Sequence, residues 1–225
     1  MARAHVVQHA ATEGLGRLAD WLPSMGLDVH PTHPYLGNRV PPSVEGDALI
    51  VLGGPMGAYD DEVAPWLPSV RELIATAIDD GVPTLGICLG AQLLAVAAGG
   101  KVEPGGNGPE IGLGEVEITT GDELFEAGTL PVVQWHHDAV TDLPAGAVLL
   151  GSNAAYPVQA FRIGEGAWGM QFHVEATPEM VQTWAVDDGL DPGPITDPVR
   201  FADGRLAEVG EAIARRFAAL VTGVG

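Results

Sequence analysis

A short apolar segment runs directly into a helical segment at Cys88, with Gly86 and Gly90 two residues away on either side. Small residues and leucines follow over 91–98. A strand that turns at once into a helix around a glycine-framed residue is typical of a nucleophile elbow. The tight turn strains the backbone of its central residue, and the glycines avoid collisions with the neighbouring chain. The feature therefore favours an α/β fold with Cys88 at the junction of a strand and a helix.

Strands and helices alternate along the first half of the chain. Residues 70–79 place apolar side chains at the three-and-four spacing of an amphipathic helix, which Gly81 and Pro83 end. Alternation of this kind predicts parallel β–α–β units. The expected strands are 4–9, 27–30, 47–52 and 84–87, and the expected helices are 15–24, 70–79 and 91–98.

The second half changes to short alternating segments punctuated by glycine and proline. They predict antiparallel additions to the sheet, followed by two helices with an acidic, proline-containing surface loop between them. We expect one domain over 1–225, folded as a three-layer α/β/α sandwich with a mostly parallel central sheet. The additions are 114–119, 132–135, 147–152, 158–163 and 167–171, the helices are 178–185 and 205–221, and the loop is 187–198.

Charge and cysteine content exclude several classes of function. The chain has 30 acidic and 10 basic side chains, a formal charge of −20, which repels a nucleic acid backbone. The one cysteine excludes an internal disulfide and a two-thiol metal site. No secretion signal and no run of about 18 apolar residues is found. We expect a cytoplasmic protein with no bound metal, no nucleic acid partner and no membrane association.

A thiol nucleophile at Cys88 needs a base, and His173 is the candidate. The start of a helix favours the thiolate form that attacks. Glu175 lies two residues after His173. If 172–175 ends an extended strand, the two side chains point to the same side, so the carboxylate orients the imidazole. Cys88, His173 and Glu175 thus fit the logic of nucleophile, base and orienting acid.

A glycine-rich loop follows the strand over 47–52. Gly53 and Gly54 open this loop, and glycine lets the backbone approach a reacting group closely. With the Leu89 amide, the loop would complete a hole for a tetrahedral oxyanion. The loop is too short to be a nucleotide-binding P-loop, and it lacks the lysine of that motif.

Five segments together carry a family resemblance that spans most of the chain. They are Gly53-Gly54-Pro55, Gly86-Ile87-Cys88-Leu89-Gly90 with Gln92, Gln134-Trp135-His136-His137-Asp138, Gln159-Ala160-Phe161-Arg162, and Gln171-Phe172-His173-Val174-Glu175. In this order they resemble the class I glutamine amidotransferases, especially the stand-alone members described as GMP-synthase-like.

The resemblance implies a flavodoxin-like α/β fold and a triad that hydrolyses the γ-amide of glutamine through a γ-glutamyl thioester, releasing glutamate and ammonia. The triad maps onto Cys88, His173 and Glu175. No cofactor is implied. The oxyanion hole maps onto the amides of Gly54 and Leu89, and the substrate contacts map onto Gly53, Gln92, His136, His137 and Asp138.

Two positions depart from the family pattern. The family's His-Gly-Asp stretch has His137 at its centre here, and Val174 stands where many members have proline. A bulkier residue at 137 is compatible with recognition by the backbone but reshapes the pocket. The adjacent histidines lack a second cluster of ligands, so they do not predict a metal site.

Three hypotheses of function stay open. The first is a glutaminase that passes ammonia to a separate synthetase chain, because nothing in the sequence resembles an ATP-using acceptor domain. The second keeps the triad but acts on γ-glutamyl peptides or conjugates. The third is a non-catalytic binding subunit, against which the complete triad argues. Proteases and chaperones of the wider superfamily draw their histidine from the position after the cysteine, which is Leu89 here.

Overall fold

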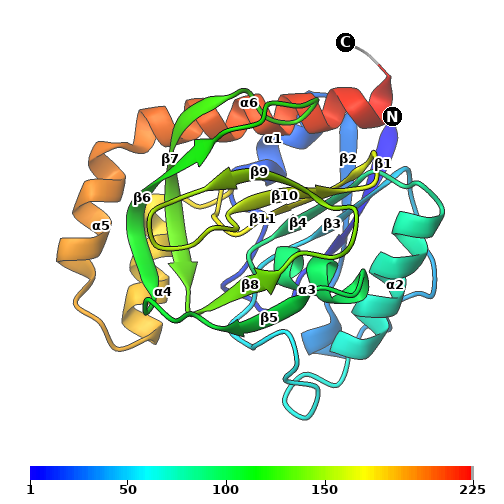
Figure 1. Cartoon of the computed structure of the whole chain (residues 1–225), viewed down its shortest axis with the longest axis horizontal. Helices are drawn as coiled ribbons and strands as arrows, with labels where there is room; N and C mark the ends of the chain where they lie inside the picture. Colours follow the sequence, from blue (N-terminus) through cyan, green and yellow to red (C-terminus); the bar gives the residue numbers. More distant parts are fainter. Residues whose placement is uncertain (224–225) are drawn as a thin grey trace.

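The computed structural model describes residues 1–223, and the last two residues of the predicted 1–225 domain lie outside this description. Within the described residues, nine strands form one sheet in the order β2-β1-β3-β4-β11-β10-β9-β6-β7 (Figure 1). β5 and β8 form a separate antiparallel pair. The strands are β1 Ala2–Val7, β2 Leu27–Thr32, β3 Ala48–Val51, β4 Thr84–Ile87, β5 Lys101–Pro104, β6 Glu110–Ile118, β7 Gly128–His136, β8 Asp138–Asp142, β9 Val148–Ser152, β10 Ala160–Ile163 and β11 Ala167–Met170.

The sheet has a parallel half and an antiparallel half that meet at β11. β2, β1, β3, β4 and β11 pair in parallel, and every residue of β3 and β4 is buried, as strands covered on both faces require. β10, β9, β6 and β7 continue the sheet in antiparallel pairs. The predicted fold class is confirmed. One detail was wrong: β11 was expected as an antiparallel addition, whereas it pairs in parallel with β4 and in antiparallel with β10.

Helices cover both faces of the parallel half and make the three layers. On one face α1 and α6 pack on β1 through Leu18, Leu22 and Phe217, and α6 is the long red helix in Figure 1. On the other face α2 and α3 pack on β3. The helices are α1 Leu18–Ser24, the 3₁₀ turn η1 Pro34–Leu36, α2 Leu67–Asp79, α3 Leu89–Ala97, α4 Pro178–Asp187, α5 Pro192–Phe201 and α6 Asp203–Thr222. Over residues 1–223 no helix has the length and apolar character that a membrane crossing demands.

Helix α5 lies where the sequence predicted a surface loop over 187–198, so that prediction was wrong. Asp191 caps the helix by accepting a hydrogen bond from the Gly193 amide at 3.2 Å. Pro192 occupies the first turn, where a backbone N–H has no helical partner in any case. Val199 is buried against α4 in a small apolar cluster. Proline content therefore marked the start of a helix here and not its absence.

Candidate active site

Cys88 occupies a strained turn between β4 and α3. Its φ of 52° and ψ of −109° make it the one non-glycine residue with positive φ in residues 1–223. A Cβ on Gly86 would lie 2.6 Å from the carbonyl oxygen of Gly90, and one on Gly90 would collide with the carbonyl oxygen of Val51. Both flanking positions thus require glycine. A backbone in this region persists only where the surroundings hold it, which is common at reactive sites.

Three neighbouring strand ends deliver the candidate catalytic residues to one edge of the sheet. The glycine loop follows β3, Cys88 follows β4, and the segment of His173 follows β11. These strands are parallel neighbours, so their carboxyl ends lie side by side. Ligands of open α/β sheets bind at this edge.

Cys88 is 6% exposed, and its sulfur makes two hydrogen bonds with the protein. The thiol donates to the carbonyl oxygen of Trp135 at 3.6 Å, and the Gln171 side-chain amide donates to the sulfur at 3.6 Å. Cys88 is also the N-cap of α3, and the free amide groups of the first turn of this helix favour negative charge.

His173 and Glu175 form the linked pair that the sequence predicted, although not on a strand. β11 ends at Met170, and His173 continues through an isolated antiparallel bridge to Val133, to whose carbonyl oxygen its amide donates at 2.8 Å. The bridge keeps the segment extended locally. His173 Nδ1 lies 2.6 Å from Glu175 Oε1, with both side chains buried. The carboxylate thus fixes the imidazole ring.

The charges around His173 favour its protonated form. Burial lowers the His173 pKa, but the negative charges of Glu175 and of a Cys88 thiolate outweigh burial and raise that pKa well above its ordinary value. The Trp184 ring packs against the imidazole at a centroid distance of 4.8 Å. Within residues 1–223 Nε2 has no hydrogen-bond partner, which leaves it available for proton transfer.

The glycine loop approaches the elbow closely. A Cβ on Gly54 would lie 2.8 Å from Leu89 Cδ2, so a larger residue here would force the Leu89 side chain to shift. A Cβ on Gly53 would lie 2.7 Å from Glu13 Oε2 and 3.2 Å from His173 Cε1. The structure therefore brings both glycines of the predicted loop against the other candidate residues.

A cavity of about 600 Å³ opens over Cys88. Gly53, His173 and Glu175 lie behind its wall and are buried or nearly so. Of the predicted site residues, the cavity is lined by Gly54, Cys88, Leu89, Gln92, His136, His137 and Asp138.

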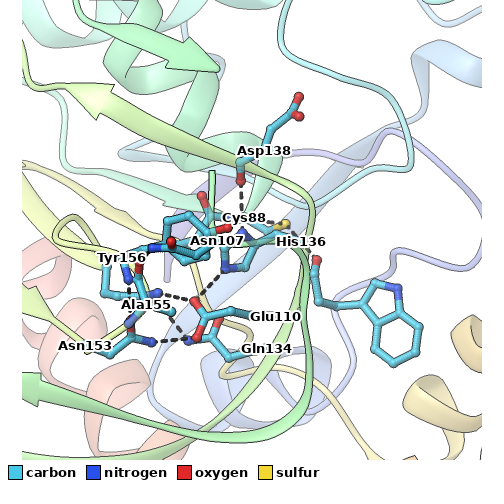
Figure 2. Close-up of polar contacts among 12 residues, drawn as sticks. Cys88, Asn107, Glu110, Gln134, His136, Asp138, Asn153, Ala155 and Tyr156 are labelled. Carbon is cyan, nitrogen blue, oxygen red and sulfur yellow. Dashed lines mark hydrogen bonds and ion pairs between the residues drawn. The ribbon is translucent and has the colours of Figure 1, made fainter. Parts of the chain in front are cut away.

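Glu110, which the sequence did not single out, anchors the predicted substrate loop. Figure 2 shows the His136 ring between Glu110 and Asp138, with Nε2 3.0 Å from Glu110 Oε2 and Nδ1 2.9 Å from the Asp138 carbonyl oxygen. Asn153 and Gln159 donate to the same carboxylate. Burial raises the Glu110 pKa, but these hydrogen bonds outweigh it and hold the pKa below its ordinary value.

Gln92 links this loop to the sulfur. Its amide nitrogen donates to the Asp138 carbonyl oxygen at 3.1 Å and to Gln171 Oε1 at 3.2 Å. Gln171 in turn donates to Cys88. The donor group of Gln92 is thus engaged with the protein, so this side chain positions the loop and the nucleophile.

Glu13 is a second residue that sequence reasoning missed. It lies in the loop after β1, lines the cavity and is 9% exposed. Burial is the main cause that raises the Glu13 pKa to about 7. The positive charge of His173 lowers this pKa, and the negative charges of Glu175 and Asp188 raise it further. Across residues 1–223 no cluster of three His, Cys, Asp or Glu side chains has the geometry to bind a metal ion.

The strained elbow, the buried His–Glu pair and the parallel sheet define an α/β protein with a cysteine at the head of a helix. The chain belongs to the class I glutamine amidotransferases, whose family model matches residues 26–190. It is 32% identical over 195 residues to a putative glutamine amidotransferase-like protein, YfeJ, of Salmonella typhimurium, covering 80% of this chain and 78% of the relative. The family assignment made from the five sequence segments is confirmed.

Other relatives agree with this assignment. The chain is 36% identical over 158 residues to a glutamine-hydrolysing GMP synthase of Azoarcus, covering 64% of this chain but 29% of that longer protein. The solved structure of a Thermotoga maritima glutamine amidotransferase superposes with a TM-score of 0.85 at 29% identity, over 96% of this chain and 97% of that one. A glutamine amidotransferase from Methylobacillus flagellatus gives a TM-score of 0.85 at 27% identity, over 99% and 95% of the two chains.

Proposed function

We propose that the protein hydrolyses the γ-amide of glutamine through a γ-glutamyl thioester on Cys88. The observation that carries the proposal is the position of the sulfur: it lies in a strained elbow, faces a cavity, and as a thiolate raises the pKa of His173 in the buried His173–Glu175 pair. A nucleophile activated by a base that a third group orients is the arrangement of covalent acyl transfer.

In the first half-reaction the thiol proton is held by His173, as the raised pKa of that histidine favours, and the sulfur attacks the amide carbon. The amides of Gly54 and Leu89 stabilise the oxyanion of the tetrahedral intermediate, a contribution of about 3 kcal/mol per donor in enzymes of this kind. His173 then gives its proton to the leaving nitrogen, and the C–N bond breaks. Ammonia leaves, and the γ-glutamyl thioester remains on Cys88.

In the second half-reaction His173 removes a proton from water, which attacks the thioester carbon. The C–S bond breaks, the sulfur recovers a proton from His173, and glutamate leaves. Glu175 stays ionised and stabilises the imidazolium in both halves.

We further propose that a separate synthetase chain uses the ammonia. The support is that the matched segment makes up 29% of the glutamine-hydrolysing GMP synthase of Azoarcus. That relative hydrolyses glutamine, and the family model that matches residues 26–190 of this chain is that of the class I glutamine amidotransferases.

The test is glutamate and ammonia release from glutamine by wild type, Cys88→Ala and Cys88→Ser. We expect turnover by wild type only, and a covalent γ-glutamyl adduct that hydroxylamine removes as the hydroxamate. The matched control is Thr222→Ala at the far end of α6. Release of ammonia by Cys88→Ala at the wild-type rate would rule out the thioester.

A further inference from the structure

Three acidic side chains gather on one wall of the cavity, which Thr12 and Trp184 also line. Glu13 comes from the loop after β1, and Asp187 and Asp188 come from the carboxyl end of α4. The carboxyl end of a helix adds partial negative charge of its own. Over residues 1–223 no Lys or Arg side chain lines the cavity to balance this wall.

Acidic side chains at a helix end are usually solvated, and Asp187 and Asp188 are exposed. Asp188 also accepts a hydrogen bond from Trp135 at 3.0 Å. Glu13 differs from both: it is 9% exposed, borders the cavity, and within residues 1–223 its carboxyl has neither an ion pair nor a hydrogen bond from the protein. A buried carboxylate without a partner is costly unless a ligand supplies one.

In the proposed reaction this wall would lie on the side of the leaving group. His173 must reach the leaving nitrogen to protonate it, and the Glu13 carboxyl flanks the same glycine, Gly53, as the His173 ring. Trp184, which packs on His173, belongs to the helix that ends in Asp187 and Asp188. In the proposed reaction, the amine that leaves as the thioester forms would therefore be the part of the substrate nearest to these carboxylates.

The cavity also has room for more than glutamine. Its volume of about 600 Å³ falls in the range that accommodates drug-sized ligands. A γ-glutamyl group on Cys88 would fill the end next to the elbow, leaving space along the acidic wall.

We propose that the acidic wall is a cation subsite and that the protein also hydrolyses γ-glutamyl amides of aliphatic diamines and polyamines. The inference rests on the proposed acyl transfer to Cys88. The amide C–N bond breaks, the leaving nitrogen takes its proton from His173, the diamine departs, and water completes the release of glutamate. The second ammonium group of the diamine pairs with Glu13, with Asp188 beside it.

The test measures binding in the Cys88→Ala background, so that it does not depend on turnover. Two probes differ only in one terminal group: the γ-glutamyl amide of 1,4-diaminobutane and that of n-butylamine. We expect the cationic amide to bind about tenfold tighter by calorimetry. The γ-glutamyl amide of 4-aminobutanoate, with a negative terminus, should bind weakest.

Adding Glu13→Gln should bring the cationic and neutral amides to equal affinity, while Glu117→Gln, an exposed carboxylate on β6, should preserve the preference. Far-ultraviolet circular dichroism and a thermal melt establish that each variant folds. Equal affinities before Glu13 is changed, or a preference that survives Glu13→Gln, would overturn the cation subsite.

The same variants separate this inference from the proposed function. If wild type hydrolyses glutamine but the cationic and neutral amides bind with equal affinity, the result supports the acyl transfer and contradicts the cation subsite. If the cationic amide binds more tightly but no γ-glutamyl compound acylates Cys88, the result supports a cation-binding site and contradicts the thioester mechanism.

Discussion

At the scale of single residues, the site depends on charges held out of water. Glu175 is 1% exposed, and its charge is one of the two that raise the His173 pKa. Glu175→Gln removes that charge and leaves the shape, so we expect the His173 pKa to fall and kcat for glutamine to drop by about 10²–10⁴-fold. Steady-state kinetics from pH 5 to 9 measure both effects, and a kcat within twofold of wild type would argue against the proposed role.

Glu13 gives a second prediction, on stability. Its folded pKa of about 7 lies above its ordinary value of 4.5, so protonated Glu13 stabilises the fold below pH 4.5, and this contribution is lost as the pH rises through 7. Across that window the loss is about 3 kcal/mol. Glu13→Gln stays neutral, so its unfolding free energy should rise relative to wild type by this amount between pH 4.5 and pH 8. Urea titrations at both pH values test this, and a constant difference would contradict the assignment.

Glu110 gives a third prediction, on substrate affinity. Its carboxylate accepts from Asn153, Gln159 and, when Nε2 carries the hydrogen, His136, so Glu110→Gln weakens the anchor of the loop over 136–138. The loss of a hydrogen bond to a charged group costs about 1.5–3 kcal/mol. We expect KM for glutamine to rise at least about tenfold, with a smaller change in kcat. If the residue only supported the fold, the Tm would fall and KM would not change.

At the scale of elements, the elbow makes a sharp prediction about one glycine. A methyl group on Gly90 collides with the Val51 carbonyl oxygen, whereas one on Gly204, in the first turn of α6, has no atom within 4 Å. We expect Gly90→Ala to lose more than about 3 kcal/mol or fail to fold, and Gly204→Ala to stay within about 1 kcal/mol of wild type. Urea unfolding of the two variants measures both stabilities. A folded Gly90→Ala variant with wild-type stability would contradict the predicted steric collision.

The elements that local sequence determines were predicted well. Strand β4, helix α3 and the turn at Cys88 follow from glycine spacing and apolar runs, which depend only on neighbours in the chain. Helix α5 was missed because its stability comes from an aspartate cap and from packing on α4, neither of which a count of prolines reveals. Strands β5 and β8 were missed because four or five mostly exposed residues give little periodicity.

The candidate site was predicted only in part for a related reason. The residues that family motifs mark, such as Cys88 and His173, are recognisable in the sequence. Glu13 and Glu110 are not recognisable in the sequence, because the role of each depends on a residue far away in the chain. Glu13 lies beside His173, and Glu110 pairs with His136. Such pairs form only when the sheet brings different strand ends together.

At the scale of the whole molecule, the net charge of −20 opposes compactness. Repulsion among surface carboxylates is screened by salt, with a Debye length of about 10 Å at 0.1 M and about 3 Å at 1 M. Salt also weakens attractive pairs, but the exposed ones, such as Arg215–Glu211 and Arg200–Asp197, contribute at most about 1 kcal/mol each. Repulsion should therefore dominate, and raising sodium chloride from 0.02 to about 0.5 M should raise the Tm by a few degrees.

The same repulsion sets the pH dependence of this salt effect. Lowering the pH towards the carboxylate pKa values neutralises the excess negative charge, so the salt-induced rise in Tm should shrink at pH 5 compared with pH 8. Differential scanning calorimetry at the two pH values and two salt concentrations separates screening from ion-specific stabilisation. Potassium chloride serves as the control, because a screening effect follows ionic strength and not the identity of the cation. A Tm that falls with salt at pH 8 would mean that the attractive pairs outweigh the repulsion across the surface.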